Sequence, residues 1–238
     1  GANALVVEKE LPLNVPQIVV ENTRIALVKM AARFYGNPEE RLKIIGISGT
    51  NGKTTTSYML QSILEKAGKK TGVIGTLGVS FLGKNKPSPL TTPDPVDLFR
   101  ALAEMFLRSV EYVIMEVSAH ALHYQKLAGV AFTACIFTNF SQDHLDFFNG
   151  MEEYKKAKMR LFAPESCSVA ILNGDDEVGR EIAAMREKEG GRVVFYGLNT
   201  PADCFAIITD ECIKGTECVF NLNDNLYRVR LRMLGEYN

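Results

Sequence analysis

The sequence has no apolar run long enough to span a membrane and no signal-peptide pattern. It also has almost no net charge, because 27 lysines and arginines face 28 aspartates and glutamates over 238 residues. Nucleic acids and anionic membranes attract basic proteins, so this balance argues against both as partners. We therefore expect small-molecule partners, no nucleic acid, no membrane insertion and a cytoplasmic location.

The five cysteines form no CxxC pair, and their odd number excludes complete pairing in disulfides. Most of them lie in apolar, strand-like runs. We therefore expect buried free thiols in a reducing compartment. Cys212 and Cys218 would hold a metal only with other ligands, and the sequence offers none near them.

A glycine-rich stretch stands between a predicted strand and a predicted helix. Residues 42–47 form a β-branched run typical of a buried strand, and residues 57–67 space their apolar side chains for one helix face. Glycines at this turn let backbone N–H groups form a concavity, and the helix adds its positive end. Lys53 adds a full charge, and the Thr54 hydroxyl suits a Mg²⁺ ion. The stretch therefore predicts a polyphosphate site.

The match to the usual phosphate-loop pattern is imperfect. Ile47 stands where that pattern has its first glycine, and Gly46 lies one position further back, so GxxGxxGKT describes the stretch better. A lone GxG would indicate only a turn with a surface lysine, but a GK followed by three threonines favours nucleotide binding. The predicted nucleotide-binding residues are Gly49, Thr50, Asn51, Gly52, Lys53, Thr54 and Thr55.

Strands and helices alternate from residue 42 to residue 196. This rhythm predicts an α/β fold with a mostly parallel sheet and helices on both faces. After residue 201, short alternating segments at 205–210, 218–222 and 226–231 predict a small antiparallel appendage. Residues 1–41, with two short strands and a helix over 23–34 capped by Asn22, are expected to end a preceding α/β domain, and residues 42–238 to form a central domain. Both ends look cut, so we expect an interior piece of a longer polypeptide.

Polar side chains follow two further predicted strands. Glu116 ends the strand at 112–117, and Asn139 and His144 follow the strand at 134–138. A lone acid at such a place is often a helix cap, and a lone histidine is often structural, but parallel strands carry ligands at their carboxyl ends. Lys158 lies on a predicted helix over 151–162, either on a solvated basic face or directed at this edge.

Five motifs together resemble the Mur ligases, and within that family the synthetases that add the third residue of the peptidoglycan stem peptide. They are GTNGKTTT at 49–56, MEVSAHAL at 115–122, FTNFSQDHLDFF at 137–148, EYKKAKMRLF at 153–162 and LNGDDE at 172–177. The resemblance runs from the first residues, similar to the end of a uridine-nucleotide-binding domain, through almost all of an ATP-binding central domain. The amino-acid-binding domain is expected beyond residue 238.

The resemblance implies an ATP-dependent amide ligase with two Mg²⁺ ions. It would activate a carboxylate of UDP-N-acetylmuramoyl-L-alanyl-D-glutamate as an acyl phosphate, which an amino acid such as meso-diaminopimelate or L-lysine then attacks. Lys53, Asn139, His144 and a carbamoylated Lys158 would be catalytic, and Thr54, Glu116, His144 and Lys158 would hold the metal ions. Substrate contacts would come from Thr91, Thr92, Ser118, Tyr124 and Lys126. We expect a monomer, and no ligation by these 238 residues alone.

Two positions depart from the family pattern. The best-known members of this synthetase group have Gln and Arg where this chain has Tyr124 and Lys126, so the charge is kept but the bidentate fork is lost. The departures bear on the substrate contacts rather than on the ATP chemistry. The competing hypotheses are a folylpolyglutamate-synthetase-like ligase of the same superfamily and a non-catalytic P-loop nucleotide-binding module.

Overall fold

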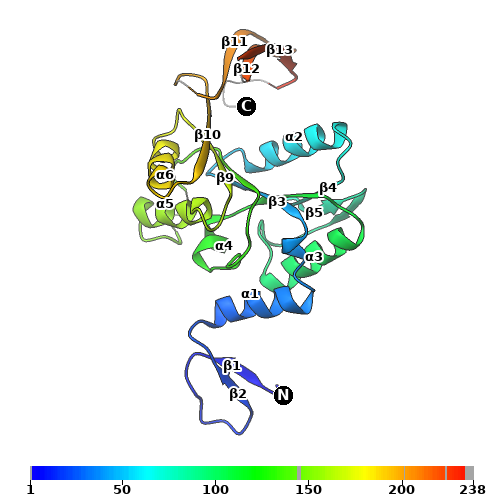
Figure 1. Cartoon of the computed structure of the whole chain (residues 1–238), viewed down its shortest axis with the longest axis vertical. Helices are drawn as coiled ribbons and strands as arrows, with labels where there is room; N and C mark the ends of the chain where they lie inside the picture. Colours follow the sequence, from blue (N-terminus) through cyan, green and yellow to red (C-terminus); the bar gives the residue numbers. More distant parts are fainter. Residues whose placement is uncertain (1, 144–145, 201, 223, 234–238) are drawn as a thin grey trace. The chain divides into compact units, whose positions relative to one another are not determined.

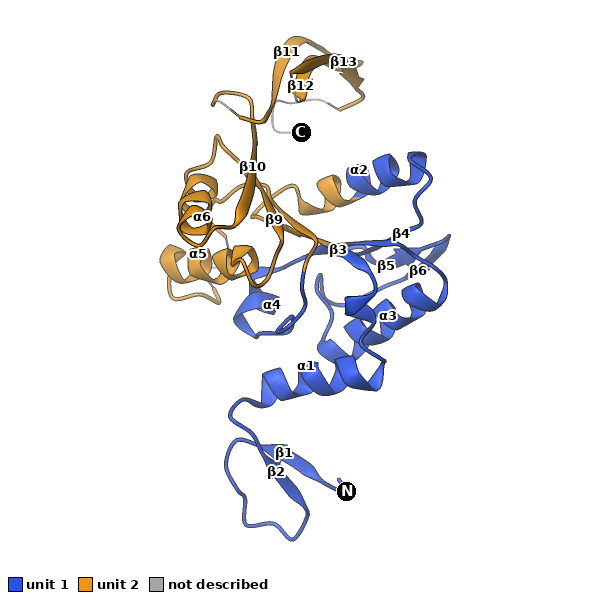
Figure 2. Ribbon diagram, in the orientation of Figure 1, with its two compact units in different colours: residues 1–44, 58–131 blue, residues 45–57, 132–238 orange. Residues whose placement is uncertain are grey.

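The computed structural model describes residues 2–143, 146–200, 202–222 and 224–233 (Figure 1). They form two compact units, residues 1–44 with 58–131 and residues 45–57 with 132–238 (Figure 2). The chain crosses between the units inside β3 (Lys43–Ser48), inside α2 (Lys53–Lys66) and after residue 131. Each unit is described by itself below.

The second unit is built on parallel strands. The strand β3 pairs with β8 (Ala134–Phe137), β8 with β9 (Val169–Asn173) and β9 with β10 (Arg192–Gly197), all in parallel. Ile47 of β3 is fully buried, as in parallel strands covered on both faces. The helical elements of this unit are the first turn of α2, α5 (Met151–Met159), the 3₁₀ turn η2 (Arg160–Phe162) and α6 (Glu177–Lys188), which packs on β9 and β10.

An antiparallel appendage follows the parallel strands of the second unit. The end of β10 pairs in parallel with the start of β11 (Cys204–Cys212). The strands β12 (Gly215–Leu222) and β13 (Asn225–Leu231) then continue the sheet in antiparallel order. The predicted small antiparallel segment is therefore confirmed.

The first unit holds a second group of strands. Here β4 (Thr71–Gly75) runs parallel to β7 (Tyr112–Glu116) and antiparallel to β5 (Gly78–Phe81), which pairs with β6 (Lys84–Lys86). Its helical elements are α1 (Thr23–Phe34), the 3₁₀ turn η1 (Pro38–Glu40), the part of α2 from residue 58 on, α3 (Pro95–Leu107) and α4 (Ala119–His123). A separate parallel pair joins β1 (Leu5–Val7) and β2 (Gln17–Val19).

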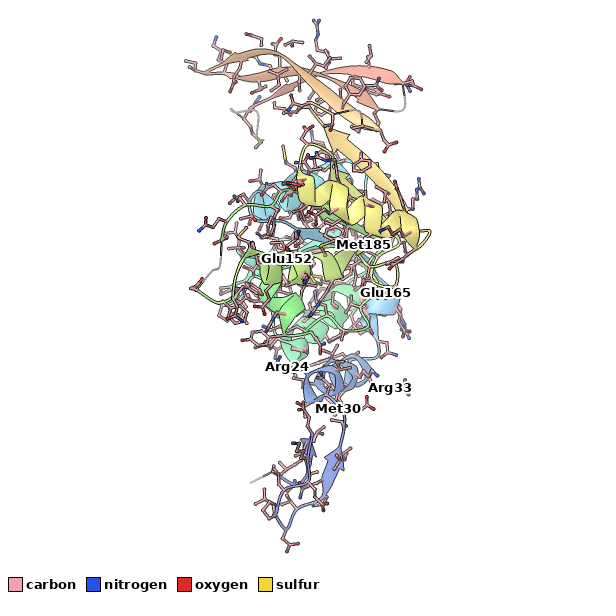
Figure 3. All side chains as sticks on the ribbon, turned by 90° about the vertical axis from the view of Figure 1, so that its left-hand side faces the viewer. Arg24, Met30, Arg33, Glu152, Glu165 and Met185 are labelled. Atoms are coloured by element: carbon pink, nitrogen blue, oxygen red, sulfur yellow. The ribbon has the colours of Figure 1, made fainter. Side chains whose placement is uncertain are left out.

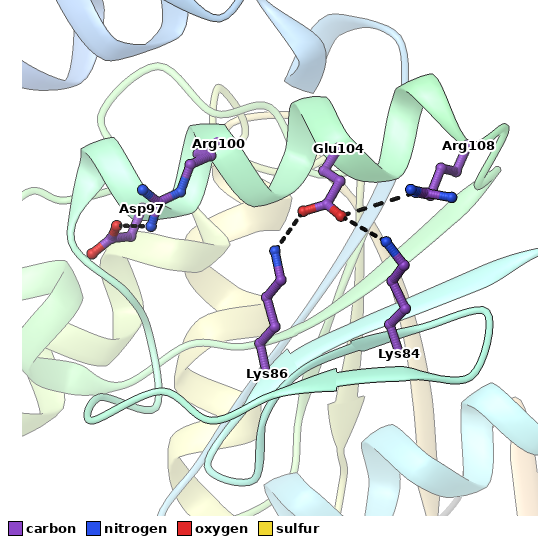
Figure 4. A network of polar contacts seen from close by, with 6 residues as sticks. All are labelled: Lys84, Lys86, Asp97, Arg100, Glu104 and Arg108. Carbon is purple, nitrogen blue, oxygen red and sulfur yellow. Dashed lines mark hydrogen bonds and ion pairs between the residues drawn. The ribbon is translucent and has the colours of Figure 1, made fainter.

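An ion-pair network joins β6 to α3 (Figure 4). The Glu104 carboxylate accepts hydrogen bonds from Lys86 Nζ at 2.7 Å and Lys84 Nζ at 3.2 Å, and Arg108 Nε lies 3.9 Å away. The hydrogen bond from Lys86, and then that from Lys84, lowers the pKa of Glu104. Exposed pairs of this kind contribute little individually, so the network mainly fixes where the short, polar strand β6 lies.

Helix α1 shares its core with α3. The Asn22 side chain accepts hydrogen bonds from the Arg24 and Ile25 N–H groups, as the sequence predicts for the N-cap. Val28, Ala31 and Ala32 are buried, and α1 packs on α3. The domain boundary expected at residue 41 stays a prediction.

The predicted α/β class is confirmed, with mostly parallel strands and intervening helices. The strand expected over 71–77 ends at Gly75, because Thr76 and Leu77 form a turn before Gly78, whose φ of +100° favours glycine. The hairpin β5–β6 and the short helix α4 were not predicted. All five cysteines are free, and Cys135, Cys167 and Cys218 are buried, as expected. Among the described residues, every helix is too short or too polar to cross a bilayer.

Candidate functional site

The loop between β3 and α2 depends on two glycines. Gly49 has φ +147° and Gly52 has φ +82°, both in a region that side-chain-bearing residues rarely adopt. The loop ends directly in the first turn of α2, which begins at Lys53. The first N–H groups of a helix have no acceptor within the helix, and the helix dipole adds positive potential there. The predicted strand–loop–helix is therefore confirmed.

Residues 138–139, which follow β8, form hydrogen bonds with the backbone of this loop. Thr50 N donates to Asn139 O at 2.9 Å, and Asn51 N donates to Asn139 Oδ1 at 3.0 Å. In return, Thr138 Oγ donates to Asn51 O at 2.6 Å. The predicted catalytic residue Asn139 thus lies beside the loop and fixes its backbone.

Two lysines converge on one backbone oxygen of this loop. Lys53 Nζ donates to Gly49 O at 2.9 Å and to Thr50 O at 2.8 Å. Lys158 Nζ donates to the same Gly49 O at 2.7 Å. The predicted gathering of Lys158 with the phosphate loop is therefore confirmed, and the alternative of a solvated basic face is wrong for Lys158, whose side chain is 1% exposed.

Burial and charge shift the protonation of Lys158. Its burial, and then the nearby charge of Lys53, lower the pKa of Lys158 to about 7, while Asp143 opposes the shift. The ammonium also lies 4.6 Å from the centroid of the Tyr154 ring. At neutral pH a large fraction of Lys158 is therefore the neutral, nucleophilic amine.

The lowered pKa of Lys158 makes stability depend on pH. The unfolded chain keeps this proton up to about pH 10.4, whereas the folded chain releases it near pH 7, so stability should rise with pH between these values. The Lys158→Met variant lacks this proton. We expect the free energy of unfolding of the wild type, relative to that variant, to rise by roughly 1.4 kcal/mol per pH unit from pH 7.5 to 9.5, measured by urea denaturation. Parallel pH curves for the two proteins would contradict the shift.

Three residues for which the sequence predicted no role form hydrogen bonds with the backbone of residues 137–140, beside the loop. Asn173 Nδ2 donates to Thr138 O at 2.9 Å, and Tyr196 Oη donates to Phe137 O at 2.9 Å. Asp176 Oδ2 accepts from Phe140 N at 2.8 Å, while its Oδ1 caps α6. These contacts join β9, β10 and α6 to the segment that holds the loop.

Replacing Asp176 with serine should separate the two functions of this carboxylate. Serine still caps a helix, but it is too short to cap α6 and also reach the Phe140 N–H. We expect a loss of about 1–2 kcal/mol in stability and at least roughly tenfold faster amide hydrogen exchange at Phe140. Glu177→Ser, at the exposed neighbouring position, is the control: it should leave exchange at Phe140 unchanged and cost only about 0.3–1 kcal/mol, the effect of losing an acid at a helix start. Unchanged exchange at Phe140 would show that the bond does not hold the segment.

Tyr154 is a further residue that sequence reasoning missed. Its hydroxyl lies 3.3 Å from Thr50 Oγ, its ring faces Lys158, and its side chain is fully buried. Tyr154 stands four residues before Lys158 on α5, so the i, i+4 spacing was the available signal.

A second cluster of predicted residues lies in the first unit. The Glu116 carboxylate is fully buried and accepts hydrogen bonds from Thr76 N at 3.2 Å and Thr76 Oγ at 3.0 Å. Thr92 Oγ donates to Glu116 O at 2.9 Å and accepts from Ser118 N at 3.0 Å, and Thr91 Oγ lies 3.2 Å from Thr76 Oγ. A side chain on Gly75 would collide with Glu116, because a Cβ there would lie 2.1 Å from Oε1. Thr76 and the backbone of Gly75 therefore enclose the Glu116 carboxylate closely.

The remaining predicted residues lie elsewhere or outside the described chain. Tyr124 and Lys126 lie after α4 in the first unit, where Lys126 Nζ pairs with Asp94 Oδ1 at 2.7 Å. His144 lies outside the described residues. Within the described ranges, no group of three or more His, Cys, Asp or Glu side chains could hold a metal ion. The metal set predicted from Thr54, Glu116, His144 and Lys158 stays a prediction.

The fold and the loop define the class of the protein. A glycine-rich turn between a buried parallel strand and a helix, with a lysine at the helix start, is the architecture of a P-loop α/β nucleotide-binding domain. The model of the Mur ligase middle domain matches residues 47–238, and the chain belongs to this family.

Named relatives support the assignment. The chain is 41% identical over 234 residues to the UDP-N-acetylmuramoyl-L-alanyl-D-glutamate--2,6-diaminopimelate ligase of Aquifex aeolicus, covering 94% of this chain and 47% of that protein. It is 40% identical over 245 residues to such a ligase of Clostridium acetobutylicum, covering 100% and 49%. The chain thus spans about half the length of the curated relatives it matches.

Solved structures agree on the fold. A structure of a UDP-N-acetylmuramoyl-L-alanyl-D-glutamate--2,6-diaminopimelate ligase matches with a TM-score of 0.86 and 26% identity, over 100% of this chain and 49% of that one. A Mycobacterium tuberculosis folylpolyglutamate synthase complexed with ADP and AMPPCP matches with a TM-score of 0.70 and 16% identity, over 90% and 55%. The second similarity shows a shared fold alone.

Proposed function

We propose that the chain is the nucleotide-binding part of an ATP-dependent amide ligase that adds an amino acid to UDP-N-acetylmuramoyl-L-alanyl-D-glutamate in peptidoglycan synthesis. The relatives at 40–41% identity carry this acceptor and 2,6-diaminopimelate in their names. The observation that carries the proposal is the meeting of Lys53 and Lys158 at Gly49 O inside a phosphate-type loop. A ligase must bring a carboxylate to a polyanion, and the positive charge of Lys53 offsets part of that repulsion.

The loop residues fit ATP and Mg²⁺. Gly49, Gly52 and the first turn of α2 present backbone N–H groups and a positive dipole end, which suit phosphate oxygens. Lys53 would hold the outer phosphates, and the Thr54 hydroxyl is an oxygen ligand of the kind that Mg²⁺ prefers. Bound ATP would supply the phosphoryl group that activates the acceptor carboxylate as an acyl phosphate. The second Mg²⁺ ion and the metal roles of Glu116 and His144 remain part of the proposal.

Lys158 suits carbamoylation. Its pKa of about 7 leaves the amine lone pair available to attack the carbon of CO₂. A C–N bond forms, one C=O electron pair moves to oxygen, and the nitrogen releases a proton to solvent, so the neutral amine becomes a carbamate anion. Incubation with ¹³C-bicarbonate should give a carbamate carbon signal in NMR that Lys158→Ala lacks and Lys156→Ala, at an exposed position of α5, keeps.

The test of function is ligation by the full-length polypeptide. We expect ATP-dependent product from UDP-N-acetylmuramoyl-L-alanyl-D-glutamate with one member of a panel that includes meso-diaminopimelate and L-lysine. Residues 1–238 alone should give no product. Turnover of a folate with glutamate instead would favour the folylpolyglutamate-synthetase-like ligase, and ATP hydrolysis without any acyl product would favour the non-catalytic module. The cytoplasmic location and the monomeric state stay predictions.

A further inference from the structure

A pocket of about 330 Å³ lies in the first unit, between α1 and the residues that follow α4. Leu27 and Leu90 contribute apolar wall, and Arg24, Tyr124, Lys126 and Asp94 contribute its polar and aromatic groups. Small-molecule sites combine apolar walls with a few polar groups in this way. Two of these residues, Tyr124 and Lys126, are the positions that depart from the family pattern.

The start of α1 is fastened to this pocket at two points. The Arg24 guanidinium carbon lies 4.7 Å from the centroid of the Tyr124 ring, and Asn22 Nδ2 donates to Gln125 Oε1 at 2.9 Å. Gln125 has φ +56°, the left-handed conformation that often ends a helix, and it stands directly after the C-cap of α4. Figure 3 labels Arg24 on α1, together with Arg33 at the other end of the same helix.

The two cations of the pocket differ in what they can offer a ligand. Lys126 pairs with Asp94 at 2.7 Å, and its side chain is only 16% exposed, so its charge is already matched. Arg24 is exposed, and in the described part of the chain its guanidinium forms no hydrogen bond or ion pair. Glu8 lies close enough for the Arg24 charge to lower its pKa, but hydrogen bonds from Thr23 have the larger effect on that carboxylate. The five N–H donors of Arg24 therefore remain available.

Helix stability does not explain an arginine at this position. Arg24 stands in the first turn of α1, where no acidic side chain is present and the helix dipole disfavours a cation. The Tyr124 ring offsets this cost only in part, since exposed cation–π contacts contribute about 0.5–1 kcal/mol. The ring does hold the planar fork beside the pocket, and such a fork suits the bidentate binding of a carboxylate or phosphate.

We infer that Arg24 is a specificity-determining residue that binds an anionic group, a carboxylate or a phosphate, of the ligase's acceptor substrate. The inference rests on the proposed function. The planar guanidinium of Arg24 can form two parallel hydrogen bonds with one anionic group, which the ammonium of Lys126 cannot. The Tyr124 ring holds this guanidinium in place.

The test compares Arg24→Gln with Arg33→Gln in the full-length ligase. Arg24→Gln should raise the KM for UDP-N-acetylmuramoyl-L-alanyl-D-glutamate by roughly 10–100-fold, the range for losing hydrogen bonds to a charged group, with the KM for ATP unchanged. Arg24→Lys keeps the positive charge but cannot form two parallel hydrogen bonds. Its acceptor KM should lie between those of the wild type and Arg24→Gln. Arg33→Gln, at an exposed position of the same helix, should behave as the wild type. An acceptor KM within twofold of wild type for Arg24→Gln overturns the inference.

Two inhibitors identify the anion. UDP-N-acetylglucosamine carries a diphosphate without the peptide carboxylates, and N-acetylmuramoyl-L-alanyl-D-glutamate carries the carboxylates without the diphosphate. Arg24→Gln should weaken inhibition by one of them at least tenfold, and weakening of neither overturns the inference even if the acceptor KM rises. Absence of acceptor turnover in the wild type refutes the proposed function itself, an outcome that no Arg24 variant can mimic.

Discussion

Alanine in place of Gly49 should destabilise the protein by more than about 3 kcal/mol and abolish nucleotide binding. A Cβ at this position would lie 1.9 Å from Thr138 Oγ and 3.0 Å from both Asn139 N and Asn139 O. The φ of +147° adds strain for any residue with a side chain. Backbone strain and overpacking each cost about 1–3 kcal/mol, and here they occur together. Urea denaturation and ATP titration of the two proteins measure the effect.

Two matched variants separate strain from collision. Gly68→Ala places a side chain at φ +76° with nothing within 4 Å, so it should cost only about 1 kcal/mol. Thr138→Ala removes the nearest obstacle, so adding it to Gly49→Ala should cost less than the sum of the single variants. Strict additivity of Gly49→Ala and Thr138→Ala would show that the collision does not exist.

Methionine in place of Lys53 should lower the ligation rate of the full-length enzyme by at least about 10²-fold. The ammonium lies between Gly49 O and Thr50 O, in the loop proposed to hold the phosphates. Removing a single preorganised group that stabilises developing charge costs about 10²–10³ in rate. The ATP affinity should fall as well, because Lys53 would contact the outer phosphates in the ground state too.

The control for Lys53 is Lys66→Met, at the exposed end of the same helix. This variant should keep wild-type rate and ATP affinity. Lys53→Arg should recover little activity, because the guanidinium is larger than the ammonium that now fits between two carbonyl oxygens. Ligation by Lys53→Met at more than a tenth of the wild-type rate would contradict the role of this lysine.

The strand, loop and helix around Lys53 could be predicted because the sequence patterns of neighbouring segments all favour the same structure there. The β-branched run, the glycines and the apolar helix face all point to one structure, and local and global preferences coincide. Lys158 was predicted from a resemblance between motifs, and the structure adds a physical reason for it, since burial, and then the charge of Lys53, lower the pKa of its amine to about 7.

Other features depend on contacts between distant residues and could not be predicted. The strand β6 reads Lys-Asn-Lys, with no strand pattern, and it forms through pairing with β5 and through ion pairs to Glu104. The pocket at Tyr124 needs Arg24, which lies 100 positions earlier in the sequence. No periodicity in the sequence reports such a pair, because it exists only after α1 has docked.

The acceptor that Lys53 and Lys158 share is a main-chain oxygen. Mutation can remove either amine, but no change of codon removes the carbonyl of residue 49, which every amino acid carries. Substitutions can therefore change the two lysines one at a time, while the partial negative charge of this oxygen stays in place. A protein chemist who wishes to alter that point must change the backbone itself, for example by an amide-to-thioamide exchange.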